Sequence, residues 1–204
     1  LESVDSTNLE LSRRLSNGKL ENFSLVVSHS QTAGMGRLGR SWVSEPESSI
    51  SASLYLTSKH TAELGWATLI AAVSIRSAIA ELVSEDVLVK WPNDVYVDGK
   101  KLCGILVELA GQAHAGCDVI IGIGMNIRLP QQALNNIDQL YTDLACAADK
   151  VIDRNELVAL LQQQVMTLLT EFTHQGFAAF VDEFDRYNQY RNKAVKLIGK
   201  EEIR

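Results

Sequence analysis

The pattern of apolar and polar residues along the chain alternates between strand-like and helix-like segments. Short runs rich in aliphatic residues, bounded by polar or glycine positions, predict strands at 23–30, 48–57 and 117–125. Small and aliphatic residues cover most of the circumference of a helix at 62–84, so we expect this helix to be well buried, with Trp66 in the core. The pattern favours helices and strands built around one core.

Polar residues mark where further helices begin. Thr7 and Glu10 fit a capping box that opens a helix near the start of the chain, and Asp153 and Glu156 fit a capping pair for a long amphipathic helix. The remaining predicted segments are a polar loop at 128–138, a helix at 177–187 and a strand at 194–198.

The pair Asp98-Gly99 predicts a tight hairpin turn between two strand-like runs, because glycine adopts positive φ at little cost. Charged residues occur at the ends of these runs, where side chains can converge on a ligand while residues 105–107 fix the backbone. These charged residues are Lys90, Asp94, Lys100 and Lys101. On this pattern alone, a buried hairpin with solvated lysines at its turn remains an open alternative.

Residues 31–42 read QTAGMGRLGRSW and combine glycines with arginines. This composition is unsuited to a helix or a buried strand and predicts a basic loop. Glycines let backbone amides approach a phosphate closely, and arginines supply planar, charged donors. The loop is therefore a candidate for binding a phosphate or carboxylate, with a solvated mobile loop as the alternative.

Composition narrows the class of protein. The chain has 204 residues, 46% of them apolar, which suffices for one sizeable domain, and its net charge of -6 argues against a general nucleic-acid surface. Its cysteines, Cys103, Cys117 and Cys146, are far apart and predict neither a zinc site nor a disulfide framework. The longest apolar run is interrupted by polar residues, and no leader-like segment opens the chain, so we expect a cytoplasmic protein without a membrane span.

Residues 90–108, KWPNDVYVDGKKLCGILVE, resemble the central motif of biotin protein ligases, a KWPND block followed by a hairpin and a KL-GIL-E run. Three further blocks support the resemblance. Ser6-Thr7-Asn8 matches an STN triplet, the basic loop is similar to a GRGRxGRxW loop, and a strand ends in a G-x-G-x-N pattern. The loop departs from the family at one position, where Met35 replaces the first arginine and offers no hydrogen-bond donor to an anion.

The resemblance covers nearly the whole chain and implies an α+β fold. The expected architecture is a mixed β-sheet with helices mainly on one face, similar to class II aminoacyl-tRNA synthetase catalytic domains. Residues 1–190 would form the catalytic domain, and residues 191–204 would start a small, truncated C-terminal β domain.

The implied reaction has two steps. Biotin is activated by ATP, with Mg²⁺, to biotinyl-5'-AMP, and the biotinyl group is then transferred to a lysine of the biotin carboxyl carrier protein or another biotin-acceptor domain. The resemblance also allows a homodimer and implies neither nucleic acid nor membrane as a partner. Two other readings are a degenerate module that binds biotin or its adenylate and a lipoate-type acyl-protein ligase.

The resemblance also implies roles for residues of this chain. Lys101 is expected to contact the biotin carboxylate and the α-phosphate, Arg37 and Arg40 the phosphate, and Asp94 the Mg²⁺ ion. Gln31 would contact biotin, and Trp42 would form a wall near the nucleotide. The other expected biotin or adenylate contacts are Ser6, Thr7, Asn8, Gly34, Met35, Gly36, Gly104 and Asn126.

Overall fold

The computed structural model of the chain describes residues 1–18, 20–44, 46–58, 64–113, 116–130, 140–148 and 151–195. Its centre is a sheet with strand order β2-β4-β8-β7-β6-β5, in which every neighbouring pair is antiparallel. The strands are β2 (Leu25–Ser28), β4 (Ser49–Ser58), β5 (Val87–Lys90), β6 (Asp94–Val97), β7 (Lys100–Ala113) and β8 (Gly116–Asn126). A small parallel pair joins β1 (Ser3–Val4) to β3 (Ser30–Gln31).

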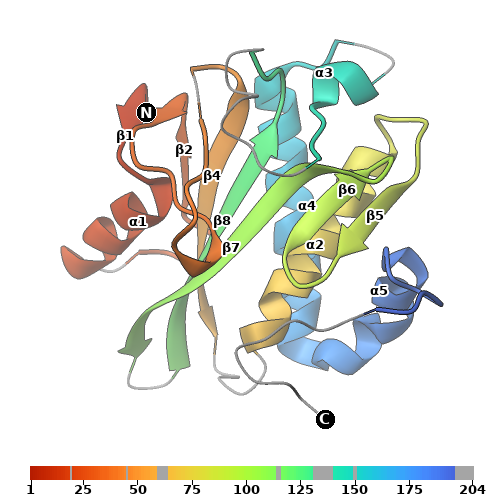
Figure 1. The fold of residues 1–204 in the computed structure, drawn as a ribbon. Helices are drawn as coiled ribbons and strands as arrows, with labels where there is room; N and C mark the ends of the chain where they lie inside the picture. Colours follow the sequence, from red (N-terminus) through yellow and green to blue (C-terminus); the bar gives the residue numbers. More distant parts are fainter. Residues whose placement is uncertain are drawn as a thin grey trace.

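Helices cover the sheet unequally. The long helices α2 (Leu64–Ala80) and α4 (Arg154–Gln175) pack together behind the sheet as seen in Figure 1, and α1 (Thr7–Ser16) lies against β4 and β8 on the opposite face. The shorter helices are η1 (Arg37–Gly39), α3 (Leu144–Ala147), η4 (Phe177–Phe180) and α5 (Val181–Tyr187). The expected α+β fold with helices mainly on one face is confirmed, but the six-stranded sheet, which we expected to be mixed, is antiparallel throughout.

Strand β4 shows why the two faces of the sheet differ. Its even-numbered residues from Ile50 to Leu56 are aliphatic and join the core under α2 and α4. Its odd-numbered residues Ser49, Ser51 and Ser53 are equally buried but face the other way, because side chains alternate along a strand. One face of the sheet therefore builds the core, and the other presents small polar groups.

The two predicted capping pairs have different outcomes. Asp153 accepts hydrogen bonds from the backbone N–H groups of Asn155 and Glu156, as a helix N-cap should, so the prediction for α4 is confirmed. The capping box at Thr7 is wrong. Thr7 is the first residue inside α1, where its side chain contacts Gln31 and Ser53, and Ser6 is the N-cap residue.

Trp66 is also misplaced by the sequence prediction, since it is 42% exposed. It lies in the first turns of α2 and stacks on Phe177 with ring centroids 4.3 Å apart, outside the core. The segments expected as a loop at 128–138 and a strand at 194–198 lie mostly outside the described residues. The same is true of residues 191–204, which were expected to start a small C-terminal β domain. None of the described helices is long and apolar enough to cross a membrane.

Candidate active site

Glycines on β7 and β8 leave room on the polar face of the sheet, and side chains from elsewhere in the chain fill that room. A Cβ atom at Gly122 would lie 2.5 Å from Asn8 Oδ1, and one at Gly124 would lie 2.5 Å from Cε2 of Trp42. A Cβ at Gly104 would come within 3.3 Å of both Lys101 and Trp42. These glycines are required because Asn8, Trp42 and Lys101 lie directly on the strands.

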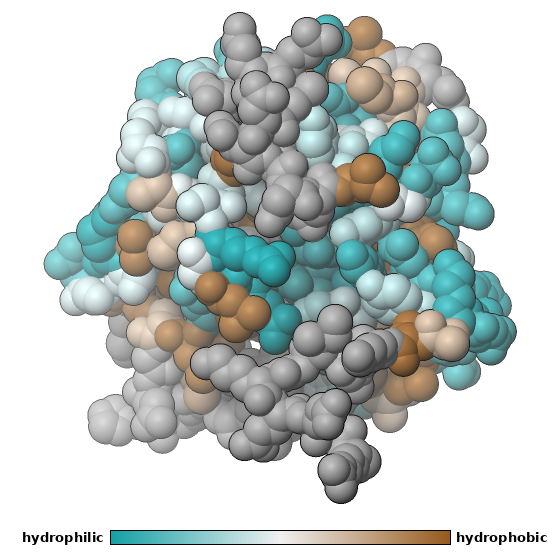
Figure 2. Space-filling model, viewed as in Figure 1, coloured by the Kyte–Doolittle hydropathy of each residue, from teal (hydrophilic) through white to brown (hydrophobic). Residues whose placement is uncertain are grey.

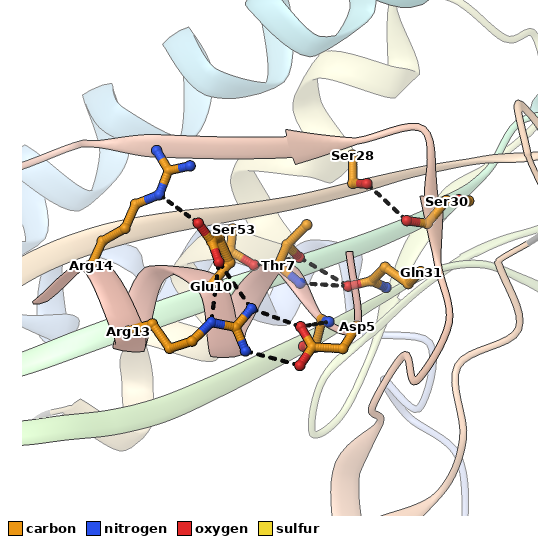
Figure 3. A network of polar contacts seen from close by, with 10 residues as sticks. Asp5, Thr7, Glu10, Arg13, Arg14, Ser28, Ser30, Gln31 and Ser53 are labelled. Atoms are coloured by element: carbon orange, nitrogen blue, oxygen red, sulfur yellow. Dashed lines mark hydrogen bonds and ion pairs between the residues drawn. The ribbon is translucent and has the colours of Figure 1, made fainter. Parts of the chain in front are cut away.

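The start of α1 brings its polar residues onto this floor. Ser6, Thr7 and Asn8 are all buried. Thr7 donates through its backbone N–H to Gln31 Oε1 at 2.8 Å, and the Thr7 hydroxyl lies 3.1 Å from the same oxygen (Figure 3). The structure therefore joins the predicted STN triplet to Gln31 in one polar cluster.

An exposed ion pair supports this cluster from outside. Arg13 donates to both carboxylate oxygens of Asp5 at 2.9 and 2.8 Å, and Asp5 also accepts from the backbone N–H of Ser6 (Figure 3). The hydrogen bonds from Arg13 are the main cause that lowers the pKa of Asp5 to about 2. Asp5 thereby fixes the turn that leads into α1.

Lys101 and Asp94 form an ion pair at the opening of the β6–β7 hairpin. Lys101 Nζ lies 2.8 Å from Asp94 Oδ1, and each side chain is 14% exposed. The Lys101 ammonium also lies 5.8 Å from the centre of the Trp42 ring. Lys90 and Lys100 do not join them, because Lys90 donates to the Tyr96 hydroxyl and Lys100 pairs loosely with Asp98.

The basic loop contributes part of the pocket wall. A pocket lies between the start of α1, the loop and the glycine floor, and its lining includes Met35, Gly36 and Arg37. Arg40 is exposed and is not among the described residues that line the pocket. In Figure 2 the middle of this face is mostly hydrophilic, with hydrophobic residues in small separate patches around it.

The pocket unites most of the predicted site residues. Its lining also includes Ser6, Thr7, Asn8, Gln31, Trp42, Lys101 and Gly104. Gly34 lies beside it, because a Cβ there would come 3.1 Å from Gln31 Nε2. Asn126 is not brought in, since it is buried and donates to the Thr142 carbonyl at 3.0 Å.

Three polar residues of this region were missed from the sequence. Asn93 lines the pocket and its Nδ2 donates to the Ile105 carbonyl at 2.9 Å, which ties the turn before β6 to β7. Ser53 and Glu108 contact Asn8 from below the lining. The available signals were the alternating serines of β4 and the single charge in the aliphatic run of β7.

The described residues do not build a metal site of their own. No group of three or more His, Cys, Asp or Glu side chains among them is arranged to hold a metal ion. Asp94, the expected Mg²⁺ ligand, has Lys101 Nζ beside one of its oxygens. A magnesium ion at Asp94 would therefore need most of its ligands from elsewhere.

Several known proteins are similar to this chain. A sequence model described as the Biotin/lipoate A/B protein ligase family matches residues 1–126. The bifunctional ligase/repressor BirA of Escherichia coli is 33% identical over 206 residues, which covers 98% of this chain and 62% of BirA. The chain thus spans less than two thirds of the length of this relative.

Solved structures agree with the sequence comparison. Biotin protein ligase from Aquifex aeolicus in complex with biotin and ATP matches with a TM-score of 0.82 and 29% identity, covering 98% of this chain and 82% of that one. The Leishmania major ligase in complex with biotinyl-5-AMP matches with a TM-score of 0.75 and 25% identity, covering 99% and 85%. The family match includes α1, the basic loop and the hairpin with Lys101, and the chain belongs to the biotin/lipoate A/B protein ligase family.

Proposed function

We propose that this domain activates biotin with ATP to biotinyl-5'-AMP and transfers the biotinyl group to a lysine of an acceptor protein. The observation that carries the proposal is the position of Lys101 in a pocket that also holds the Thr7–Gln31 cluster. A cation and a set of amide and hydroxyl groups are thereby separated within one cavity. This arrangement suits a ligand with a polar ring at one end and a carboxylate at the other.

The first step attaches the biotin carboxylate to the α-phosphorus of ATP, and pyrophosphate leaves. Negative charge develops on phosphate oxygens, and fixed cations in a dry site stabilise such charge strongly. Lys101 is the cation for the carboxylate and the α-phosphate, because Asp94 holds its ammonium at 2.8 Å and only 14% of the Lys101 side chain is exposed. Arg37, which lines the same pocket, is the second cation, and Arg40 would have to move inward to be a third.

The second step needs no protein nucleophile. The amine of an acceptor lysine attacks the carbonyl carbon of the mixed anhydride, a new amide forms, and AMP leaves with the bonding electrons. The protein's task in this step is to orient the adenylate and exclude water. Trp42 fits the second task, since its ring lies over Gly104 and Gly124 beside Lys101.

Mg²⁺ enters this proposal as part of MgATP. Magnesium is commonly held by one or two carboxylates together with substrate phosphate oxygens. Asp94 is our candidate for such a carboxylate: its Oδ1 pairs with Lys101 Nζ, and its second oxygen would be the one to bind Mg²⁺.

Biotin is favoured over lipoate by the chemistry of the pocket. The buried groups at the start of α1 are hydroxyls and amides, and leaving such groups unpaired against an apolar ring costs free energy. A lipoate-type ligase would present an apolar channel at this position. Met35 supports a second candidate, a binding module without efficient transfer, because it lines the pocket and offers no donor to an anion.

The acceptor is proposed to be a biotin carboxyl carrier protein or a similar biotin-acceptor domain, in the cytoplasm. Strand β6 pairs with β7 only as far as Gly104, whereas β7 continues to Ala113. The outer edge of β7 beyond Ile105 therefore has no strand partner among the described residues, and Leu109 on it is 66% exposed. Such an edge suits strand addition by an acceptor domain or by a second copy of the chain.

The proposal is tested by measuring pyrophosphate release with MgATP and either biotin or lipoate. We expect pyrophosphate release with biotin and not with lipoate, and we expect the biotinyl group of the product to be transferred to an acceptor lysine. Release with lipoate would favour the lipoate-type ligase. Biotin binding by calorimetry without pyrophosphate release would favour the binding module.

A further inference from the structure

The main chain of Lys101, the proposed cation for the α-phosphate, is held by a segment from a later part of the sequence. The Lys101 backbone N–H donates to the Leu140 carbonyl at 3.0 Å, and the Lys101 carbonyl accepts from the Thr142 N–H at 2.9 Å. Residues 140–142, which we call the Lys101 clamp, run parallel to β7 here, with Tyr141 opposite Lys101. The clamp therefore uses both main-chain hydrogen-bonding groups of Lys101.

The sheet leaves Lys101 at an irregular place. The register between β6 and β7 pairs Val95 with Cys103 and Tyr96 with Lys101, so Leu102 is an extra residue in the ladder. An extra residue of this kind disrupts the ladder locally. On the other side of β7, the register with β8 begins at Cys103. The position of the Lys101 main chain thus depends on the clamp.

Asp143 ties the clamp to the end of β8. It follows the clamp directly and is 8% exposed. Its Oδ2 accepts from the Leu129 N–H and its Oδ1 from the Cys146 N–H, both at 2.9 Å. Leu129 lies just beyond β8, and Cys146 lies in α3, which is near the start of β7 in Figure 1. Hydrogen bonds to a carboxylate are stronger than those between neutral groups, so Asp143 fixes the clamp relative to the sheet.

We propose that Asp143 is a positioning residue for Lys101. Asp143 is not among the described residues that line the pocket, and it acts through the clamp on the Lys101 main chain. The inference rests on the proposed function, in which Lys101 stabilises negative charge on the α-phosphate. A shift of a catalytic group by about 1 Å can lower a rate by on the order of 10²-fold. Loosening the clamp should therefore slow formation of the adenylate and leave the binding of biotin unchanged.

Asp143→Asn tests this role with little change in size. An amide has one acceptor oxygen, so its nitrogen would face the N–H of either Leu129 or Cys146, and one of the two hydrogen bonds would be lost. Asp153→Asn is the matched control, because both N–H groups that donate to Asp153 bind the same oxygen, Oδ1. The same substitution therefore breaks a contact at position 143 and none at position 153.

The assay measures pyrophosphate release with MgATP and biotin, below the unfolding temperature of every variant. We expect kcat of Asp143→Asn to fall about ten- to a hundredfold with an unchanged KM for biotin, and the control to match the parent. In a Lys101→Ala background, Asp143→Asn should lower kcat no further, because its effect passes through Lys101. Asp143→Ser is a second variant in case Asp143→Asn does not fold, since serine also caps helices but has one oxygen in place of two.

A purely structural role of Asp143 predicts other results. A parental kcat in Asp143→Asn, a loss of biotin affinity as large as the fall in kcat, or an equal further fall in the Lys101→Ala background would each overturn the inference and leave the proposed function standing. A lower kcat in Asp153→Asn would do the same, because the effect would not be specific to the clamp. If neither Asp143 variant folds, Asp143 serves the stability of the fold and the inference is overturned. A parent that releases no pyrophosphate with biotin would overturn the proposed function and this inference with it.

Discussion

The contact between Gly122 and Asn8 is the sharpest test of how the pocket floor is built. Gly122→Ala adds one methyl group at a position where a Cβ would meet three atoms of Asn8, the nearest being Oδ1 at 2.5 Å. Real Cβ atoms do not come this close to another heavy atom, so Asn8 has to move. Its hydrogen bonds to Glu108 at 2.7 Å and to Ser53 at 2.5 Å would then lengthen or break.

The expected size of the effect follows from these contacts. Adding a methyl group to a packed site costs about 1–3 kcal/mol, and each kcal/mol lowers Tm by about 2–4 °C in a domain of this size. We therefore expect Tm to fall by roughly 2–12 °C. Asn8 also lines the pocket, so its displacement should weaken the binding of biotin as well.

Thermal unfolding and calorimetry with biotin measure both effects. Gly18→Ala is the matched control, because no heavy atom lies within 4 Å of a Cβ at that position. The control should keep the parent's Tm and affinity. A Gly122→Ala variant that also keeps both would refute the placement of Asn8 against β8.

Three further predictions concern charged side chains in and beside the pocket, or, at Met35, the addition of one. Lys101→Ala should lower kcat for pyrophosphate release by about 10²–10³-fold, and equal activity of the parent and Lys101→Ala would exclude the assigned role. Adding Asp94→Asn to this variant should recover the lost Tm but not the activity, because the second substitution removes the carboxylate that Lys101→Ala leaves unpaired. Met35→Arg should slow the release of preformed biotinyl-5'-AMP by about ten- to a hundredfold, because the arginine adds a charged donor to the pocket wall. A chase with unlabelled biotin measures the release, and an unchanged rate would show that position 35 does not contact the adenylate. Asp5→Asn should lower the free energy of unfolding at neutral pH. Because the pKa of Asp5 is about 2 in the folded protein and 3.8 as its ordinary value, the Asp5 carboxylate stabilises the fold above pH 3.8, and this stabilisation is lost as the pH falls through 2. Urea titrations should therefore show the stabilities of parent and variant converging over this range, and a constant difference would contradict the Arg13 contact.

Much of the fold follows from local sequence signals. The Asp98-Gly99 turn lies between β6 and β7, as the need for a residue with positive φ predicts, and Asp153 caps α4 as its spacing from Glu156 predicts. These signals act within a few residues of each other. They are independent of how the elements pack, which is why the sequence alone was sufficient.

The wrong predictions concern residues whose positions are determined by tertiary contacts. Thr7 has the residue type and spacing of a capping box, but Gln31 and Ser53 bind its side chain across the fold. Trp66 is apolar and lies in a helix of small and aliphatic residues, yet it covers Phe177 at the outer end of that helix. None of these three partners is near in sequence, so no local pattern reveals them.

The site was predicted best where the motif is continuous. Residues of the Lys90–Glu108 motif and of the basic loop meet in one pocket, as the resemblance implied, although Arg40 lies outside it. Ser53 and Glu108 were missed because their function depends on Asn8, which is 45 and 100 residues away from them in sequence. Their only local signals are polarity and charge within aliphatic strands.

Under the proposed function, this domain makes biotinyl-5'-AMP and holds it. Native mass spectrometry of the chain after incubation with biotin and MgATP tests it most directly. We expect one biotinyl-5'-AMP bound per chain, and none in Lys101→Ala. A chain that carries only unmodified biotin, or that forms the adenylate with lipoate and not with biotin, would contradict the proposed function.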